Sequence, residues 1–370
     1  MVSAYGGGIY TSGSQVVTLT NCTFSNNTVS ASVVATGTAN NTANAFGGGI
    51  YNAGSQLTVS GGTFLTNQAS ATDTYYSNAV AGASAFGGAI YNAGSLTVTS
   101  SNIASNTANS SGGGIYNSGS LTLSTSSLTG NQAKSSSNSV SGGGLWNGGS
   151  TTVTTCILAG NSASFTNNSG NAGASGGGIY NLGSLTFSAS TLSNNSASAS
   201  ASQYYASTAY ASGGGIYNSG LQVTVADCTL SGNSATSGAS SFYINQYNSA
   251  ASYGGGIFNN GQNLIVSGST LSGNWTSASS GYYYTYNSGY PYYNIYYGSN
   301  YTGSSIGGAI YNAGTLSSGT IADASYGNTA NGFSDNGSFP TTATGSTATG
   351  LVPSIVCALH VPCHFSRPNR

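Results

Sequence analysis

Charged residues are almost missing from this chain. Its 370 residues include four aspartates, one lysine, two arginines and no glutamate, and the formal net charge is −1. Ordinary domains are about a quarter charged, so serine, threonine, asparagine and glycine must solvate this surface. Without a basic patch, we expect no binding to nucleic acid or to an anionic membrane.

Long apolar runs are also missing. No stretch approaches the roughly 18 apolar residues that suggest a membrane helix. Residues 1–4 lead directly into a repeat, without the basic and apolar regions of a signal peptide. We therefore expect a fragment of an exported protein, with its export signal outside this sequence.

The scarcity of acids argues against catalysis. Glycoside hydrolysis normally uses two carboxylates held close together, whereas Asp227 and Asp323 lie two repeats apart, Asp73 lies in a variable segment and Asp335 in the tail. Calcium-binding β-helix repeats need an aspartate in each turn, and no aspartate recurs from turn to turn here. We predict no enzyme activity, no catalytic residues, no cofactor and no metal site.

The last residues combine Cys357, Cys363 and His364. Their spacing fits no standard zinc pattern. A disulfide between the two cysteines, two free thiols and a metal site all stay open.

What the chain does contain is a glycine-rich hexapeptide, typified by residues 47–52 (GGGIYN), that recurs nine times. The copies begin at Gly6, Gly47, Gly87, Gly112, Gly142, Gly176, Gly213, Gly254 and Gly307. From each first glycine to a later asparagine the length is 20 to 22 residues, and the segment before the next copy varies from 5 to 32 residues. Constant coils with variable insertions are typical of repeat arrays.

Within each coil the apolar residues alternate with polar ones, as in Leu96-Thr97-Val98-Thr99. This period of two indicates a strand with one buried face. Short strands also fit residues 90–92 and 102–103. We therefore predict an all-β fold: a right-handed parallel β-helix (a solenoid) of about nine coils, with variable loops at one corner.

Stacked coils would align equivalent residues in columns. The hexapeptide isoleucines would form a buried column, its tyrosines would face outward, and its asparagines would form an amide ladder along the axis. The asparagines that end each coil would form a second ladder and take up the left-handed backbone of a corner. Cys22, Cys156 and Cys228 occupy one repeat position and are expected to be buried small residues.

The repeat resembles that of the chlamydial polymorphic membrane proteins, which alternate GGAI-type and FxxN-type motifs. Gly88-Ala89-Ile90 fits the first motif, and Phe24-Ser25-Asn26-Asn27 fits the second. The similarity covers residues 6–328. It implies an autotransporter passenger: a secreted β-helix, often adhesive, that is associated with the outer membrane.

The domain boundary falls where the repeat ends. We predict a β-helix domain over residues 1–331. Residues 332–370, rich in glycine, serine and threonine and then in proline, would form a linker and a C-terminal tail or cap.

Two surfaces are candidate binding sites. The first is the segment after the eighth coil, whose tyrosines either contact a partner or pack over the rod: Tyr282, Tyr283, Tyr284, Tyr286, Tyr290, Tyr292, Tyr293, Tyr296, Tyr297 and Tyr301. Tyrosine among serine, glycine and asparagine suits contact surfaces. The second is a flat outward face with a column of threonines: Thr18, Thr58, Thr97, Thr122, Thr152, Thr186 and Thr224.

Together these features predict a non-enzymatic, extracellular or cell-surface protein with a structural or adhesive role. Its expected partners are a glycan or protein on a host or neighbouring cell, or further copies stacked end to end. The alternative is an ice-binding protein that uses the threonine face. A polysaccharide-cleaving enzyme is the least favoured hypothesis.

Overall fold

The computed structural model describes residues 1–36, 41–76, 81–135, 139–167, 170–203, 206–241, 248–285, 293–296, 301–313, 329–330 and 333–334. Throughout these residues the secondary structure is β-strand joined by turns and bends, with no helix.

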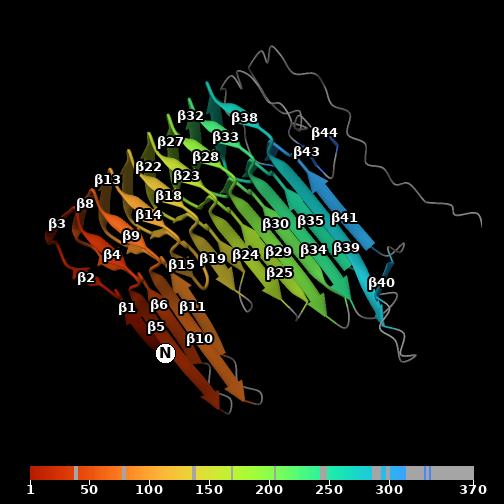
Figure 1. Cartoon of the computed structure of the whole chain (residues 1–370), viewed down its shortest axis with the longest axis horizontal. Helices are drawn as coiled ribbons and strands as arrows, with labels where there is room; N and C mark the ends of the chain where they lie inside the picture. Colours follow the sequence, from red (N-terminus) through yellow and green to blue (C-terminus); the bar gives the residue numbers. More distant parts are fainter. Residues whose placement is uncertain are drawn as a thin grey trace, which may run out of the picture.

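Each turn of the rod contributes one short strand to each of three sheets (Figure 1). The first sheet contains β2 (Ile9–Ser12), β7 (Ile50–Ala53), β12 (Ile90–Asn92), β16 (Ile115–Asn117), β21 (Leu145–Asn147), β26 (Ile179–Asn181), β31 (Ile216–Asn218), β36 (Ile257–Asn259) and β42 (Ile310–Asn312). The second contains β3 (Val16–Thr20), β8 (Gln56–Ser60), β13 (Ser95–Thr99), β17 (Ser120–Ser124), β22 (Ser150–Thr154), β27 (Ser184–Ser188), β32 (Gln222–Ala226) and β37 (Asn263–Ser267). The third contains β4 (Thr23–Ser25), β9 (Thr63–Leu65), β14 (Asn102–Ala104), β18 (Ser127–Thr129), β23 (Ile157–Ala159), β28 (Thr191–Ser193), β33 (Thr229–Ser231) and β38 (Thr270–Ser272).

Every pairing within these three sheets is parallel and joins equivalent residues of successive coils, so that Ile50, Ile90 and Ile115 lie side by side. The predicted all-β parallel β-helix is therefore confirmed. The described residues complete eight turns and add β42 as the first strand of a ninth. This is slightly fewer than the nine coils predicted, since the remainder of the last coil lies outside the described residues.

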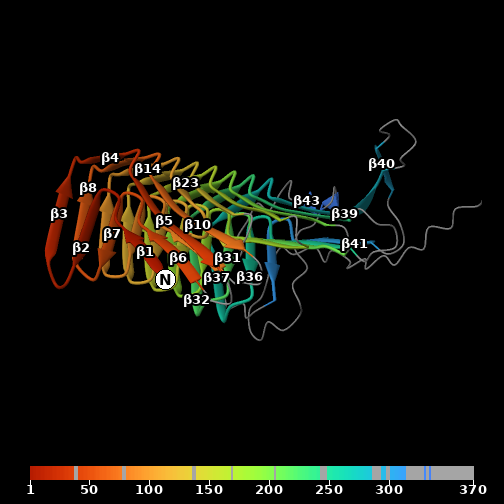
Figure 2. The same cartoon turned by 90° about the horizontal axis from the view of Figure 1, so that it is seen from below.

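The variable segments are not loops, and here the prediction was wrong. They form two further sheets that project from the rod as a wing (Figures 1 and 2). Strands leaving the rod form the outgoing wing sheet: β5 (Thr28–Thr36), β10 (Gln68–Tyr76), β15 (Thr107–Ala108), β19 (Gln132–Ser135), β24 (Ser162–Asn167), β29 (Ser196–Gln203), β34 (Ser234–Ser241), β39 (Trp275–Thr285), β43 (Thr329–Ala330) and β44 (Phe333–Ser334), with β40 (Tyr293–Tyr296) paired to β39.

Strands coming back form the returning wing sheet in two parts. The first part is β1 (Val2–Tyr5), β6 (Asn41–Phe46) and β11 (Ala81–Phe86), and the second is β20 (Val140–Ser141), β25 (Asn171–Ser175), β30 (Thr208–Ser212), β35 (Asn248–Tyr253) and β41 (Tyr301–Ile306). Alternation explains these strands: in β29 the alanines at 197, 199 and 201 are buried between the serines. Small residues that alternate with a period of two thus form two thin sheets, and the interior between them is rich in alanine.

The hexapeptide glycines have separate roles. Gly47 has φ of 68°, a left-handed conformation that glycine adopts without strain. Gly48 is packed so closely on the next coil that a Cβ atom would overlap the carbonyl oxygen of Gly88. The third position is roomier, and Ala89 and Ala309 occupy it in two of the coils.

The core of the rod consists of stacked apolar columns and two amide ladders. Asn52 donates from Nδ2 to Oδ1 of Asn92 at 2.7 Å, and the same bond repeats along the first sheet up to Asn312. In the second ladder, Asn67 donates from both its backbone N–H and Nδ2 to Oδ1 of Asn106, at 2.8 and 2.9 Å. Both predicted ladders are confirmed, and within the described residues every buried side-chain nitrogen and oxygen has a hydrogen-bond partner.

Two details complete the comparison with the predicted coil. The left-handed corner residue is the one before the ladder asparagine, such as Thr66 (φ 54°), and not the asparagine itself. The ladder asparagine is instead held by the hydrogen bonds of its side-chain amide. Cys156 and Cys228 are buried free thiols, as predicted, whereas Cys22 in the first coil is only partly buried against the core.

The predicted linker and tail, residues 332–370, lies outside the described residues apart from β44. Cys357, Cys363 and His364 therefore stay predictions.

Candidate binding surfaces

The threonine face is the outward side of the second sheet. Its seven threonines are direct neighbours in consecutive strands, from Thr18 beside Thr58 to Thr186 beside Thr224. All are exposed or half-buried, whereas the residues that flank them in sequence, such as Leu121 and Leu123, are buried. Ile265 continues the column in β37. The predicted threonines therefore line up from strand to strand on the outward side of the second sheet.

An aromatic ladder covers the outward side of the first sheet. Nine rings stack along the rod axis: Tyr10, Tyr51, Tyr91, Tyr116, Trp146, Tyr180, Tyr217, Phe258 and Tyr311. Neighbouring ring centroids lie 4.0 to 6.3 Å apart, and the planes are within 13° of parallel. The sequence predicted outward tyrosines but not their continuous stacking, although the spacing of equivalent residues in parallel strands, about 4.8 Å, implies it.

Stacking limits what this ladder can bind. Each ring face inside the ladder is covered by its neighbours, so the side of the rod presents ring edges, and a sugar could not lie flat on a ring. Near the N-terminus Phe46 packs edge-on against Tyr51 and Tyr91, which covers the ladder further. Burial and neighbouring phenols raise the pKa of Tyr51 to about 12, so its hydroxyl is neutral at any physiological pH. The main role of the aromatic ladder is therefore structural.

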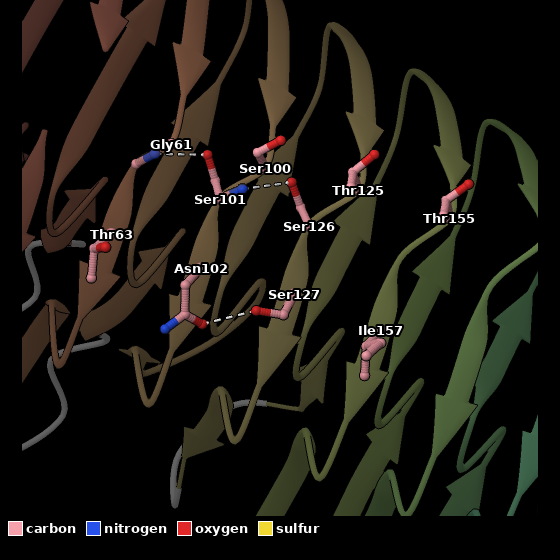
Figure 3. Close-up of a pocket in the computed structure, with 11 residues that line it drawn as sticks. Gly61, Thr63, Ser100, Ser101, Asn102, Thr125, Ser126, Ser127, Thr155 and Ile157 are labelled. Atoms are coloured by element: carbon pink, nitrogen blue, oxygen red, sulfur yellow. Dashed lines mark hydrogen bonds between the residues drawn. The ribbon is translucent and has the colours of Figure 1, made fainter. Parts of the chain in front are cut away.

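A shallow corner groove of about 460 Å³ runs between the second and third sheets (Figure 3). The Ser101 hydroxyl accepts the N–H of Gly62 at 3.0 Å, and the Ser126 hydroxyl accepts the N–H of Ser101 at 3.0 Å. On the outer side Ser127 donates to Asn102 at 2.9 Å. The groove's polar groups are therefore largely engaged in joining coils to one another, and no ionisable side chain lines it.

A second cleft, the notch, interrupts the wing. The third coil returns to the rod after five residues, so its only wing strand is the two-residue β15, and the wing on either side is longer (Figure 1). The space left between β10 and the strands β19 and β24 is about 580 Å³. Its lining mixes apolar and polar groups, and the polar side chains are Asp73 and Lys134, together with Thr72, Asn109, Ser135, Ser164 and Thr166.

This notch gathers most of the charge in the described part of the chain. Only Asp73, Lys134 and Asp227 are charged side chains there, and the first two line the notch. Asp227 has φ of 55° and occupies a corner of the rod, a place that aspartate tolerates well. That Asp73 and Lys134 line one site could not be predicted from the sequence, because 61 positions separate them and only the short third coil leaves the gap that both border.

The predicted tyrosine surface is only partly visible. Tyr282–Tyr284 belong to β39, Tyr293 and Tyr296 to β40, and Tyr301 to β41, while Tyr286, Tyr290, Tyr292 and Tyr297 lie outside the described residues. The backbone of β39 and β40 is an antiparallel pair that joins Tyr282 to Tyr296.

Other reactive groups do not converge. Burial raises the pKa of the Cys156 and Cys228 thiols, which keeps them protonated and poorly nucleophilic. Within the described ranges no three histidine, cysteine, aspartate or glutamate side chains come together as a metal site would require. Nor do these ranges hold a helix long and apolar enough to cross a membrane.

No protein-family model, curated protein or solved structure matches this chain. Its function must therefore be argued from its own geometry.

Proposed function

We propose that this chain is a non-enzymatic, extracellular or cell-surface scaffold with an adhesive or structural role, in which a stiff rod presents a lateral wing. The observation that carries the proposal is the contrast between the third coil and the others. Five residues close the third coil, whereas other coils use up to 32. Because five residues suffice to continue the rod, the longer wing segments serve something other than the rod.

The chemistry of the wing supports contact with other molecules. The outward positions of β29 are mostly serine, and the strands β39, β40 and β41 carry several of the tyrosines of the variable segments. Such residues make wide, uncharged contacts at low entropic cost. A glycan or protein on a neighbouring cell is the proposed partner, nucleic acid is not, and end-to-end association of rods stays a prediction.

The test uses the third coil as a template. Residues 275–306 are replaced by the five-residue connection 107–111, and binding of the purified protein to cells and to glycans is compared with that of the unaltered chain. Loss of binding at an unchanged urea midpoint supports the proposal. The same replacement at 196–212 is the matched control, because it shortens a different part of the wing. If the unaltered chain binds neither cells nor glycans, the adhesive role is wrong.

Location is tested separately. We propose export to the cell surface, in line with the repeat's resemblance to autotransporter passengers. Protease treatment of intact cells that express the full native gene product should remove the rod from their surface. Resistance in intact cells, with cleavage after lysis, would place the protein inside and refute this proposal.

The threonine face supports a second candidate, ice binding, because its hydroxyls are aligned from strand to strand. Thermal hysteresis by the purified chain, abolished by Thr122→Lys and Thr152→Lys but not by Asn102→Lys on the third sheet, is the expected result. Normal ice growth at high protein concentration would eliminate it.

Polysaccharide cleavage has the least support. Of the three charged side chains in the described residues, Asp73 and Lys134 line the notch and Asp227 lies at a corner of the rod, so the notch holds a single carboxylate. Release of reducing ends or unsaturated products from pectin-like polymers would overturn the non-enzymatic proposal.

A further inference from the structure

One wall of the notch is a strand edge without a partner strand. β10 pairs with β5 along all nine of its residues, but with β15 only at Gln68 and Ala69. Asn109, in the turn that closes the third coil, adds one backbone bond to Ala69 and a side-chain bond to the hydroxyl of Ser70 at 3.2 Å. Beyond that turn, within the described residues, the edge of β10 has no strand beside it.

An edge of this kind normally attracts another β-strand. Here two charges oppose such pairing. Asp73 stands opposite Val33 in the register and follows the buried Ala69 and Ala71 at alternate positions, so it belongs to the inner face of the outgoing sheet. A strand added beside β10 would cover this carboxylate and remove it from water, which is costly without a partner charge.

Lys134 protects the opposite wall. It is exposed and alternates with the buried Ala133, so it lies on the outer face of β19. Lysine on an edge strand and a charge on the inward face are two of the features by which natural sheets resist strand addition. The notch is therefore built to stay open and to exclude a peptide strand.

The groups left in the notch suit a hydroxyl-rich molecule. A carboxylate accepts hydrogen bonds from two neighbouring hydroxyls, an ammonium donates up to three, and the Asn109 amide does both. Unlike a peptide strand, a sugar would give the Asp73 carboxylate charge-assisted hydrogen bonds in place of water. The volume of about 580 Å³ lies within the range of small-ligand sites, roughly 300–1,000 Å³.

We propose that the notch binds a short segment of a neutral glycan through its hydroxyls, with Asp73 as acceptor on the inner face of the outgoing sheet and Lys134 as donor on its outer face. This inference rests on the proposed adhesive function and assigns a specific part of the wing to it. Opposite charges on the two walls favour a neutral saccharide over an acidic or a basic one.

The experiment screens the intact chain on an array of neutral and acidic glycans and measures affinity for the best neutral oligosaccharide by calorimetry. Asp73→Asn is expected to weaken binding at least tenfold. Lys134→Ser, which introduces the residue found beside it at Ser164 and Ser198, is expected to weaken it severalfold. Asp227→Asn is the matched control, because it removes a carboxylate at a corner of the rod and should leave binding unchanged.

A converse variant keeps both charges and fills the space. Replacing residues 107–111 with the second coil's segment 68–86 would extend β15 into a full wing strand, so glycan binding should be lost. Normal affinity in the filled variant, or in both charge variants, would overturn the proposal. The proposal would also be overturned if the charge variants self-associate in sedimentation without losing glycan affinity. Asp73 and Lys134 would then only protect the strand edges.

The experiments distinguish a failure of the notch assignment from a failure of the adhesive function. If cells are still bound by the charge variants, adhesion resides elsewhere in the wing and only the notch assignment is wrong. If the unaltered chain binds no cell and no glycan, both proposals fall together.

Discussion

The rod and the wing both consist mainly of parallel strands, but they bury different side chains. The rod encloses isoleucine, leucine, valine and phenylalanine together with two asparagine ladders, and the wing encloses mainly alanine. A rod strand must match the column above and below it at every position. A wing strand needs only a small residue at alternate positions, and its length accordingly varies from the two residues of β15 to the eleven of β39. Regularity thus belongs to the rod, and variation to the wing.

The sharpest test of the rod's regularity is Gly48→Ala. Its Cβ would overlap backbone atoms of Gly88 and Gln68, which cannot move aside as a flexible side chain can. We expect failure to fold or a loss of more than 4 kcal/mol in urea unfolding, on the order of the largest effects of single substitutions. Gly49→Ala is the control, since alanine already occupies this position in Ala89; an equal loss in both variants would contradict the packing argument.

The asparagine ladder should be almost as sensitive. Asn161→Ala removes the acceptor of both Asn131 bonds and the donor to Leu128 and Asn195. Nδ2 of Asn131 keeps its bond to the Ile103 carbonyl and Oδ1 of Asn195 keeps the backbone N–H of residue 161, so the buried Asn131 N–H and the Leu128 carbonyl are the two groups that lose these bonds without a substitute. At about 1–3 kcal/mol for each of these two groups, we expect a loss of roughly 2–6 kcal/mol in the free energy of unfolding. Exposed Asn102→Ala, which loses one surface bond, should change it by less than about 0.5 kcal/mol. Comparable losses would mean that the ladder is not the main support of the coil.

A large-to-small substitution in the rod and a small-to-large substitution in the wing should affect the stability of the two cores separately. Leu192→Ala leaves a cavity in the rod and should cost about 2–5 kcal/mol, whereas Ala199→Leu crowds the thin wing and should cost about 1–3 kcal/mol. Hydrogen exchange distinguishes the regions: protection should fall around β28 in the first variant and only in the wing in the second. Loss of rod protection in Ala199→Leu would show that the two regions unfold as one unit.

The smallest expected effect is a loss of the rod's stability at alkaline pH. In the folded chain the pKa of Tyr51 and of Tyr180 is raised to about 12, mainly by burial, above the value near 10 of an unfolded tyrosine. The unfolded state therefore releases protons first, so these residues contribute their stability in full below pH 10 and lose it as the pH rises from about 10 to 12.

Urea midpoints and phenolate absorbance between pH 9 and 12 would measure this dependence. Tyr51→Phe should flatten it, because phenylalanine is already found at this ladder position in Phe258 and cannot ionise. Tyr10, which is more exposed at the end of the ladder, provides the comparison variant Tyr10→Phe. A stability that does not fall at alkaline pH would contradict the burial of the ladder.

Much of the rod could be predicted because its signals are strong and local. The alternation in residues 96–99 specified a strand, and the recurrence of Ile90 and Asn92 at equal places specified the columns. The wing escaped prediction because alanine and serine carry little strand preference, although the pattern of β29 was visible as Ser-Ala-Ser-Ala. The aromatic ladder required the register between coils, which an outward tyrosine alone does not reveal.

The candidate sites divide in the same way. The alignment of the threonines follows from counting repeats, and the register between strands agrees with it; their role in binding stays a prediction. The notch exists only because one coil is short while its neighbours are long, so that Asp73 and Lys134 meet across a gap between coils.

By itself the sequence determined that this chain is a parallel rod, because each coil repeats the same buried residues and the same glycine corner. Only the tertiary structure decided that its variable segments are a wing, and where that wing is open. Whether a run of small residues forms a strand depends on the strand that lies beside it in the next coil, and that neighbour is set by the stacking of coils rather than by the run itself.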